Sequence, residues 1–180
     1  MRSLHHFLLF ISLFVLVACS STRVLKREAA APFQLSSYKT FGFYEVEASG
    51  DSVSSEVYHT GIAALRKNIA LQLERRGLRQ VADQPDLLVN IGIVNKERVQ
   101  TRQTDFMTDA PRYMGQRRYS WQSREVPVGR YNEGTVSVHL VDRVKQQMLW
   151  EGVVADVIPN KPTQLEKQVA AAMETLFKGL

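Results

Sequence analysis

The sequence predicts an α+β domain: a mostly antiparallel sheet with two helices packed on one face. Three observations support this fold class. Two segments carry apolar residues at helical spacing, several shorter segments alternate apolar and polar residues, and the predicted strands do not alternate regularly with the predicted helices. We expect residues 37–180 to form this single domain, because one domain is the natural organisation for a chain of this length.

Both helices are predicted from apolar residues that recur every three or four positions. The first helix is expected over residues 55–76 and should end at Gly77, since glycine favours the left-handed conformation that follows a helix. The second is expected over residues 163–178, with Thr163 and Glu166 as a capping box. The apolar stripe of the first helix consists of Ile62, Leu65, Ile69 and Leu73.

Period-two alternation predicts the strands. They are expected at residues 38–44, 78–81, 87–94 with an extension to 101, 119–126, 135–141 and 148–157. The last two, separated by a turn at 142–147, form the strongest hairpin signal. Trp150 lies on the apolar side of its strand, as Ile69 and Met173 do on their helices, so we expect all three side chains to be buried.

The N-terminus has the three parts of a secretory signal peptide, which we assign to residues 1–18. Arg2 supplies a positive charge, and the apolar residues 7–17 would span roughly 17 Å as a helix, too short for a hydrocarbon core of about 30 Å. The apolar run ends in a lipobox: Leu16, Val17, Ala18 and Cys19. We expect cleavage before Cys19 and acylation of that cysteine; a transmembrane anchor and an ordinary signal peptide are the alternatives.

The residue after the cysteine indicates the membrane. In Gram-negative lipoproteins, aspartate at that position typically retains the protein at the inner membrane, whereas this chain has Ser20. We therefore expect a protein anchored by its lipid in the outer membrane, with its domain facing the periplasm. Residues 19–36 are mostly small, polar or charged and are expected to form a tether, although a weak alternation at 22–27 would also suit a short edge strand.

Positive charge is concentrated in one segment. The chain has 23 Lys and Arg residues against 18 Asp and Glu residues, and residues 96–130 contain eight of the basic and four of the acidic ones. A loop is expected at 103–118, and its candidate anion-binding residues are Arg112, Arg117 and Arg118. Phosphate groups of lipids or carboxylates of peptidoglycan are the expected weak partners. The alternative is a solvated loop without a role, and secretion argues against a nucleic-acid partner.

Motifs for catalysis are missing from the sequence. There is no Gly-x-Ser-x-Gly, Walker or His-Glu-x-x-His motif, and we expect no metal or cofactor. The sequence therefore favours a non-enzymatic binding or scaffolding module that contacts an envelope protein. The alternative function is a hydrolase of envelope polymers that would use Asp142, Glu151 or His139, all on the predicted hairpin.

Short motifs along most of the chain resemble the bacterial lipoproteins grouped as DUF 4136, a domain of unknown function. They are Tyr38-Lys39-Thr40-Phe41, Leu73-x-x-x-Gly77, Pro85-Asp86-Leu87-Leu88-Val89, Gly134-Thr135, Val141-Asp142 and Leu149-Trp150-Glu151-Gly152. The resemblance implies an α+β lipoprotein domain and carries no catalytic residues. The Phe-Pro tail that usually ends the family is absent here.

Overall fold

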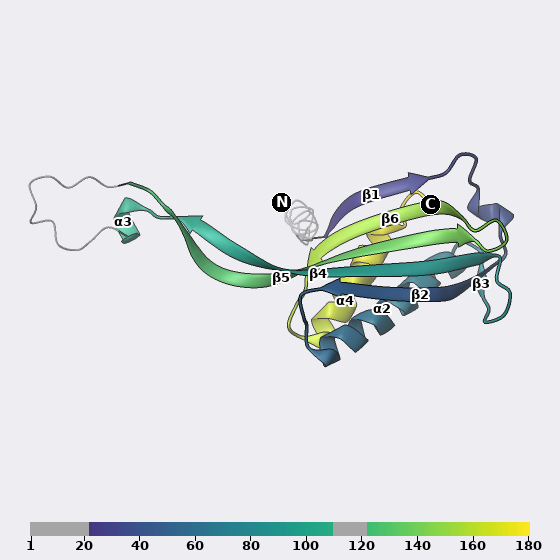
Figure 1. The fold of residues 1–180 in the computed structure, drawn as a ribbon, viewed down its shortest axis with the longest axis horizontal. Helices are drawn as coiled ribbons and strands as arrows, with labels where there is room; N and C mark the ends of the chain where they lie inside the picture. The colour runs from purple at the N-terminus through teal and green to yellow at the C-terminus, as the bar shows by residue number, and fades with distance from the viewer. Residues whose placement is uncertain (1–21, 110–121) are drawn as a thin grey trace, which may run out of the picture.

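A six-stranded sheet with two long helices against it forms the body of the protein in the computed structural model, which describes residues 22–109 and 122–180 (Figure 1). The strands are β1 (Arg23–Ala29), β2 (Thr40–Gly50), β3 (Arg79–Gln80), β4 (Leu87–Gln103), β5 (Glu125–Asp142) and β6 (Gln147–Val157). The helices are the 3₁₀ helix η1 (Leu35–Ser37), α2 (Ser55–Glu74), α3 (Phe106–Asp109) and α4 (Pro162–Leu176). The α+β class is therefore confirmed.

The sheet is mixed, so the expectation of a mostly antiparallel sheet is wrong. The strand order is β1-β6-β5-β4-β2-β3, in which β2 runs parallel to both β4 and β3 while the other neighbours are antiparallel. The cause lies in the connection after β2. Helix α2 carries the chain back along the sheet, and such a crossover returns the next strands parallel to the first.

Helix α2 forms where the apolar spacing predicts it. The Ser54 hydroxyl accepts a hydrogen bond from the Val57 amide at 3.4 Å and so caps the first turn. At the other end Gly77 adopts φ +90°, and the Leu78 amide donates to the Leu73 carbonyl at 3.2 Å. Glycine takes this left-handed conformation without steric cost, which explains why the helix stops there.

The capping box predicted for α4 is wrong. Lys161 occupies the N-cap without a side-chain cap bond, and Pro162 begins the helix, where its missing N–H is not needed. Instead, two arginines hold the other end. The Arg27 guanidinium donates to the Leu176 carbonyl at 2.9 Å, and Arg76 donates to the Phe177 carbonyl. Positive charge at a helix C-terminus is favourable because of the helix dipole.

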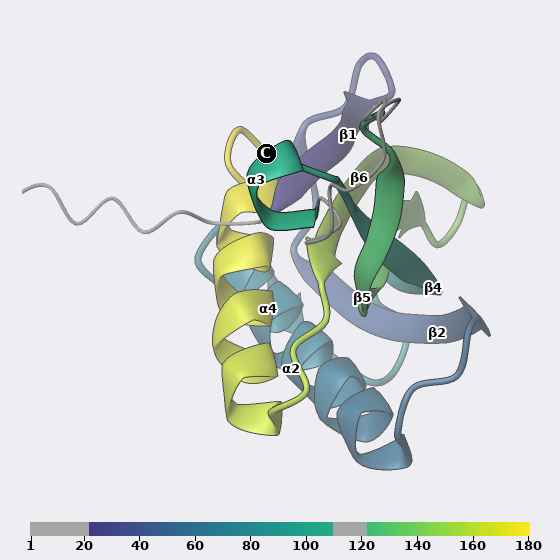
Figure 2. The same cartoon turned by 90° about the vertical axis from the view of Figure 1, so that its left-hand side faces the viewer.

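One apolar core joins the two long helices to the sheet, and the predicted burial of Trp150, Ile69 and Met173 is confirmed. Figure 2 shows α2 and α4 side by side on the same side of the sheet. The Trp150 ring packs on the Phe177 ring with 5.2 Å between centroids. It also lies directly over Gly152, where an added Cβ would come within 2.3 Å of the ring.

Strands β4 and β5 are longer than predicted, and they form one continuous hairpin from Leu87↔Asp142 to Gln103↔Glu125. The segment between the two expected strands, 127–134, is part of β5. A register shift between Gln100 and Thr101 accommodates Pro127 there. Proline has no N–H to donate to a regular strand ladder, so it is found at bulges or in edge strands. The loop expected at 103–118 therefore starts only beyond β4.

The outer part of this hairpin leaves the body of the protein. Strand β2 accompanies β4 only as far as Asn95, and β6 accompanies β5 only as far as Glu133. Among the strands that the structure describes, residues 97–103 and 125–132 therefore pair only with each other, and they project from the sheet, as Figure 1 shows. We call these two segments the arm.

The expected tether is corrected in part, because residues 23–29 belong to the sheet. They form β1, which pairs antiparallel with β6 from Arg23↔Ala155 to Ala29↔Trp150. The weak alternation at 22–27 was the relevant signal. Without β1, the edge of β6 would expose unpaired backbone groups, which favours covering it with this strand.

Candidate functional site

The residues proposed for hydrolysis do not meet in one site. His139 and Glu151 face each other across β5 and β6, with 3.7 Å between Nε2 and Oε1. Glu151 also accepts a hydrogen bond from Lys26 Nζ at 2.7 Å, and this bond lowers the pKa of its carboxyl. Glu151 is therefore held as an anion by its neighbours, which suits an ion pair better than a proton donor.

Asp142 has a separate role at the turn after β5. Its carboxylate accepts hydrogen bonds from the amides of Val144 and Lys145, both at 2.9 Å, and from the Tyr38 hydroxyl at 3.1 Å. The bond from the Lys145 amide contributes most to the lowered pKa of this carboxyl, which burial alone would raise. Asp142 thus fixes a turn, as aspartate commonly does.

Asp86 joins the start of β2 to the start of β4 at the same end of the sheet. Its carboxylate accepts hydrogen bonds from the amides of Lys39 and Thr40, both at 2.9 Å, while its own amide donates to the Thr40 hydroxyl at 2.9 Å. The bond from Lys39 is the main cause of its lowered pKa. Arg143 Nε donates to the Pro85 carbonyl at 2.7 Å and ties in the β5–β6 turn.

We call this end of the sheet the closed end; it is defined by Tyr38, Thr40, Asp86, Asp142 and Arg143. Their hydrogen bonds connect parts of the chain that are 46 to 104 residues apart. Most of these residues belong to the family motifs, and Asp142 is the only one with a candidate role predicted from the sequence, in hydrolysis. The arrangement assigns them a structural one, because each polar group is matched by a partner within the protein.

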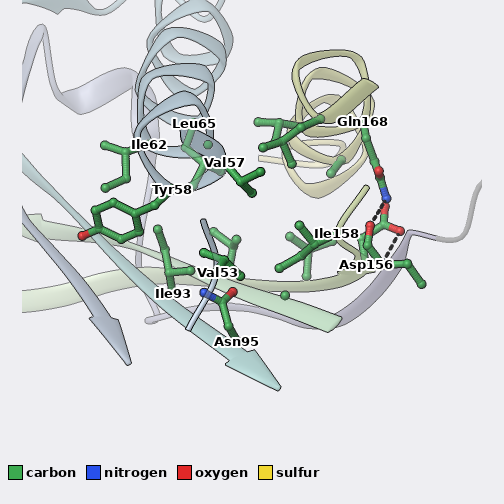
Figure 3. A pocket seen from close by; sticks show the side chains of 18 of the residues that line it. Val53, Val57, Tyr58, Ile62, Leu65, Ile93, Asn95, Asp156, Ile158 and Gln168 are labelled. Carbon is green, nitrogen blue, oxygen red and sulfur yellow. Dashed lines mark hydrogen bonds between the residues drawn. The ribbon is translucent and has the colours of Figure 1, made fainter. Parts of the chain in front are cut away.

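The opposite end of the sheet, which we call the open end, contains an apolar pocket. It lies between α2, α4 and the parts of β4, β5 and β6 next to the arm, and its volume is about 90 Å³. Figure 3 shows Val53, Ile62 and Ile93 on one side and Ile158 on the other, with Asp156 and Gln168 at its edge. No sequence pattern predicts this pocket, since its described lining comes from five separate segments of the chain.

The open end also holds the base of the arm. Glu133 is buried and lies between two arginines: Arg98 Nε is 2.8 Å from one carboxylate oxygen, and Arg23 of β1 bonds to the other. Arg98 is the main cause of the lowered pKa of Glu133. This cluster therefore joins the first described strand to the arm.

Ion pairs neutralise most of the charge on the described part of the basic segment. Arg102 makes a bidentate pair with Asp109 at 2.5 and 2.6 Å, and Arg130 lies 3.0 Å from Glu97. Residues 96–109 and 122–130 together contain five basic and four acidic side chains. The remaining excess of positive charge rests on Arg112, Arg117 and Arg118, which lie outside the described residues.

The predicted lipid site lies outside the described part of the chain as well: Leu16, Val17, Ala18 and Cys19. Within residues 22–109 and 122–180, no helix has the length and apolar character needed to cross a membrane. In the same ranges, no three His, Cys, Asp or Glu side chains are grouped so that they could hold a metal ion.

Comparison with known families decides the relationship that the motifs predict. The family model described as "Domain of unknown function (DUF4136)" matches residues 26–180. The chain belongs to this family. The match begins inside β1, so the DUF4136 domain includes a strand that sequence analysis placed in the tether. No curated protein matches the chain.

Several solved structures are similar to the DUF4136 domain only in broad outline. A PDZ domain protein from Parabacteroides distasonis matches with a TM-score of 0.44 and 13% identity over 87% of this chain, which spans 37% of that protein. The PelC dodecamer from Paraburkholderia phytofirmans gives 0.45 and 8% over 86% of this chain and 96% of that one. A homolog of a neuraminyllactose-binding hemagglutinin from Helicobacter pylori gives 0.47 and 14% over 79% and 83%. Similarity at this level carries no argument about function.

Proposed function

We propose that this protein is a lipid-anchored outer-membrane lipoprotein whose periplasmic domain acts as a binding or scaffolding module, with the arm as its contact element for an envelope protein. The arm is the observation that carries this proposal. Within residues 22–109 and 122–180 its strands pair only with each other, so each leaves one row of backbone N–H and C=O groups without a strand partner there. Such edges are where other chains add strands.

The side chains of the arm support the same role. Val99 and Val128 are 54% and 50% exposed, so the arm presents apolar surface to the solvent. A two-stranded ribbon is marginally stable in water by itself. Contact with a partner would cover these apolar groups and supply the missing neighbours of the ribbon.

Site-specific photo-crosslinking tests the arm. A photoreactive amino acid replaces Val99 in the full chain expressed in a Gram-negative host, and envelopes are irradiated before purification. We expect a discrete crosslinked envelope protein from position 99. The matched control is Val144, which is 77% exposed in the turn at the closed end and should give no such product. Equal products from both positions would contradict the proposal.

The proposed anchor places the domain close to the membrane. From Cys19 to Thr22 the chain reaches only about 10 Å, because each residue spans at most about 3.6 Å. Since β1 starts at Arg23, the open end, rather than the closed end, would face the lipid surface. Two or more acyl chains suffice for stable anchoring.

Substitution of the cysteine tests the anchor. Cys19→Ser should abolish incorporation of labelled fatty acid and leave a larger, uncleaved precursor. Detection by fluorography and immunoblot of separated membranes reports both effects. A Cys19→Ser protein that is still cleaved and labelled would refute the anchor without bearing on the arm.

Weak binding to anionic surfaces is the third part of the proposal. Three of the four excess positive charges of residues 96–130 come from Arg112, Arg117 and Arg118, so changing all three to Gln should remove most salt-sensitive binding to anionic vesicles or peptidoglycan. The melting temperature should stay nearly the same. Surface charges act over about 8 Å at physiological salt, so binding should weaken steeply as salt is added. A triple variant that sediments with vesicles as well as the parent would rule out this contact.

A further inference from the structure

The pocket at the open end is lined almost wholly by aliphatic side chains. They come from opposite walls: Val57 and Ile62 of α2, Val169 of α4, and Ile93 and Val136 of the sheet. Figure 3 shows several of these side chains pointing toward one another across the space. Among the described residues, no lysine or arginine lines the pocket. Its interior therefore suits an apolar ligand that is recognised by shape.

The polar groups at the edge of the pocket are already engaged by the protein. Gln168 Nε2 donates to the Val157 carbonyl at 2.7 Å, and Asp156 accepts a hydrogen bond from the Val157 amide at 2.8 Å. Both lie at the right of Figure 3, beyond Ile158, whereas Asn95 lies at the bottom beside Val53 and Ile93. Asn95, which is 7% exposed, is the one buried polar side chain in the described lining, so a ligand that carried several polar groups inside would lose hydration without gaining equivalent partners.

The size of the pocket limits how much of a ligand it can enclose. Its volume is about 90 Å³, smaller than the engineered apolar cavity of about 150 Å³ that binds benzene. A sterol is therefore too large to be enclosed, whereas a segment of a hydrocarbon chain can enter. Each methylene buried in such a site strengthens binding about fourfold.

The mouth of the pocket would lie close to a source of hydrocarbon chains. The hydroxyl of Thr22, the first described residue, donates a hydrogen bond to Asp156, which lines the pocket. Cys19 lies three residues earlier, so an anchored chain would hold this opening within about 10 Å of the lipid surface. The acyl chains of the leaflet are then the most abundant apolar ligands within reach.

We propose that the pocket between α2, α4 and the arm end of the sheet holds one acyl chain of a membrane phospholipid. The source of the chain, though not the pocket itself, rests on the proposed lipid anchor. The bound phospholipid keeps its head group outside, next to Asp156 and Gln168, and its chain lies between the helices and the sheet. The domain would thereby grip the leaflet surface at its open end.

Photo-crosslinking in cells tests this assignment on the full chain. Cells that express the protein take up a palmitate analogue with a chain-internal diazirine and a terminal alkyne, and envelopes are irradiated. The purified protein is digested and its modified peptides are identified by mass spectrometry. We expect adducts with the mass of an intact phospholipid on peptides that contain Val57, Ile62 or Val169. The acylated Cys19 peptide, which needs no irradiation, reports the anchor separately.

Filling the pocket should remove these adducts. Val169→Phe places a ring in the space and should reduce pocket labelling at least tenfold, while Val144→Phe in the distant turn should leave it unchanged. Gly61→Ala is the milder second variant. Its new Cβ would lie 3.7 Å from Leu165, an ordinary contact, so the fold is retained while the space narrows, and labelling should fall about twofold or more.

Three results would overturn the assignment. The first is phospholipid adducts spread over the surface without a preference for pocket peptides. The second is pocket labelling that survives in both Val169→Phe and Gly61→Ala. The third is a crosslink between a pocket peptide and the acylated Cys19 peptide in place of the phospholipid adduct, which would make the occupant the protein's own lipid. An unlabelled Cys19 peptide beside labelled pocket peptides would refute the anchor alone.

Discussion

The two ends of the sheet differ in how their polar and apolar groups are satisfied. At the closed end, carboxylates such as Asp86 and Asp142 are matched by amides and hydroxyls from distant parts of the chain. At the open end, an apolar pocket remains between the helices and the sheet, and the arm projects without strand partners. At the closed end these polar groups have their partners within the protein. The open end, in contrast, has apolar surface and strand edges that are available for contact.

The family motifs lie mainly on one side of this difference, at or beside the closed end. Tyr38, Thr40, Asp86 and Asp142, which carry much of the resemblance, belong to the closed end. Trp150 and Gly152 lie next to it, one stacked over the other. Motif residues in this domain therefore describe how it holds together. The contacts proposed above depend on the open end, where Gly134 of the family motifs lines the pocket.

The largest expected effect comes from removing the aromatic core beside the closed end. Trp150→Ala should lower the free energy of unfolding by about 3–5 kcal/mol, because it deletes a buried ring and leaves a cavity against Phe177. Denaturant melts followed by circular dichroism measure this loss. Met148→Ala, two residues away and 48% exposed, is the matched control and should change little. A loss below about 1 kcal/mol for Trp150→Ala would mean that the ring is not part of the core.

An added methyl group under the same ring should have a smaller effect. Gly152→Ala puts a Cβ within 2.3 Å of the Trp150 ring, so the ring must move and the core is overpacked. A loss of about 2 kcal/mol is expected. In Gly129→Ala the nearest atom outside the adjacent residues is a side-chain oxygen at 3.7 Å, so this arm variant serves as the control. Equal melting midpoints for the two variants would contradict the stacking of Trp150 on Gly152.

Acid should weaken the closed end through Asp86. Because its folded pKa is lowered, the carboxylate adds stability above its ordinary pKa of 3.8, and this stability is lost as the pH falls from there through the folded value. Asp86→Asn should cost about 1 kcal/mol at neutral pH and flatten the loss of stability below about pH 4. Melts at pH 7 and pH 3 test this. Asp83→Asn in the same exposed turn should behave like the parent, and an unchanged acid response in Asp86→Asn would show that the connection contributes nothing.

The smallest effect on stability is expected from removal of the arm. Replacing residues 97–132 by Asn-Gly joins Lys96 to Glu133, which are directly paired, through a two-residue hairpin turn. Every residue of the apolar core remains in the shortened chain, so the free energy of unfolding should change by less than about 1 kcal/mol. Thermal melts measure this. A loss above about 2 kcal/mol would make the arm part of the fold rather than a contact element.

The sequence by itself determined the features that depend on neighbours along the chain. Helical spacing identified α2 and α4, Gly77 identified the end of α2, and alternation identified the hairpin of β5 and β6. The same periodicity placed Trp150, Ile69 and Met173 in the core. These predictions succeeded because the local repeat of side chains shows which face of an element is apolar.

Only the tertiary structure decided how distant segments pair. The parallel contact of β2 with β4 depends on the path of α2 across the sheet, and β1 became a strand because β6 offered an open edge. The arm passes Pro127 because a register shift opposite Gln100 and Thr101 absorbs it. The pocket is assembled from several elements that are far apart in sequence. Periodicity shows that a segment can bury one face, but the partner that covers that face is chosen by packing over the whole chain.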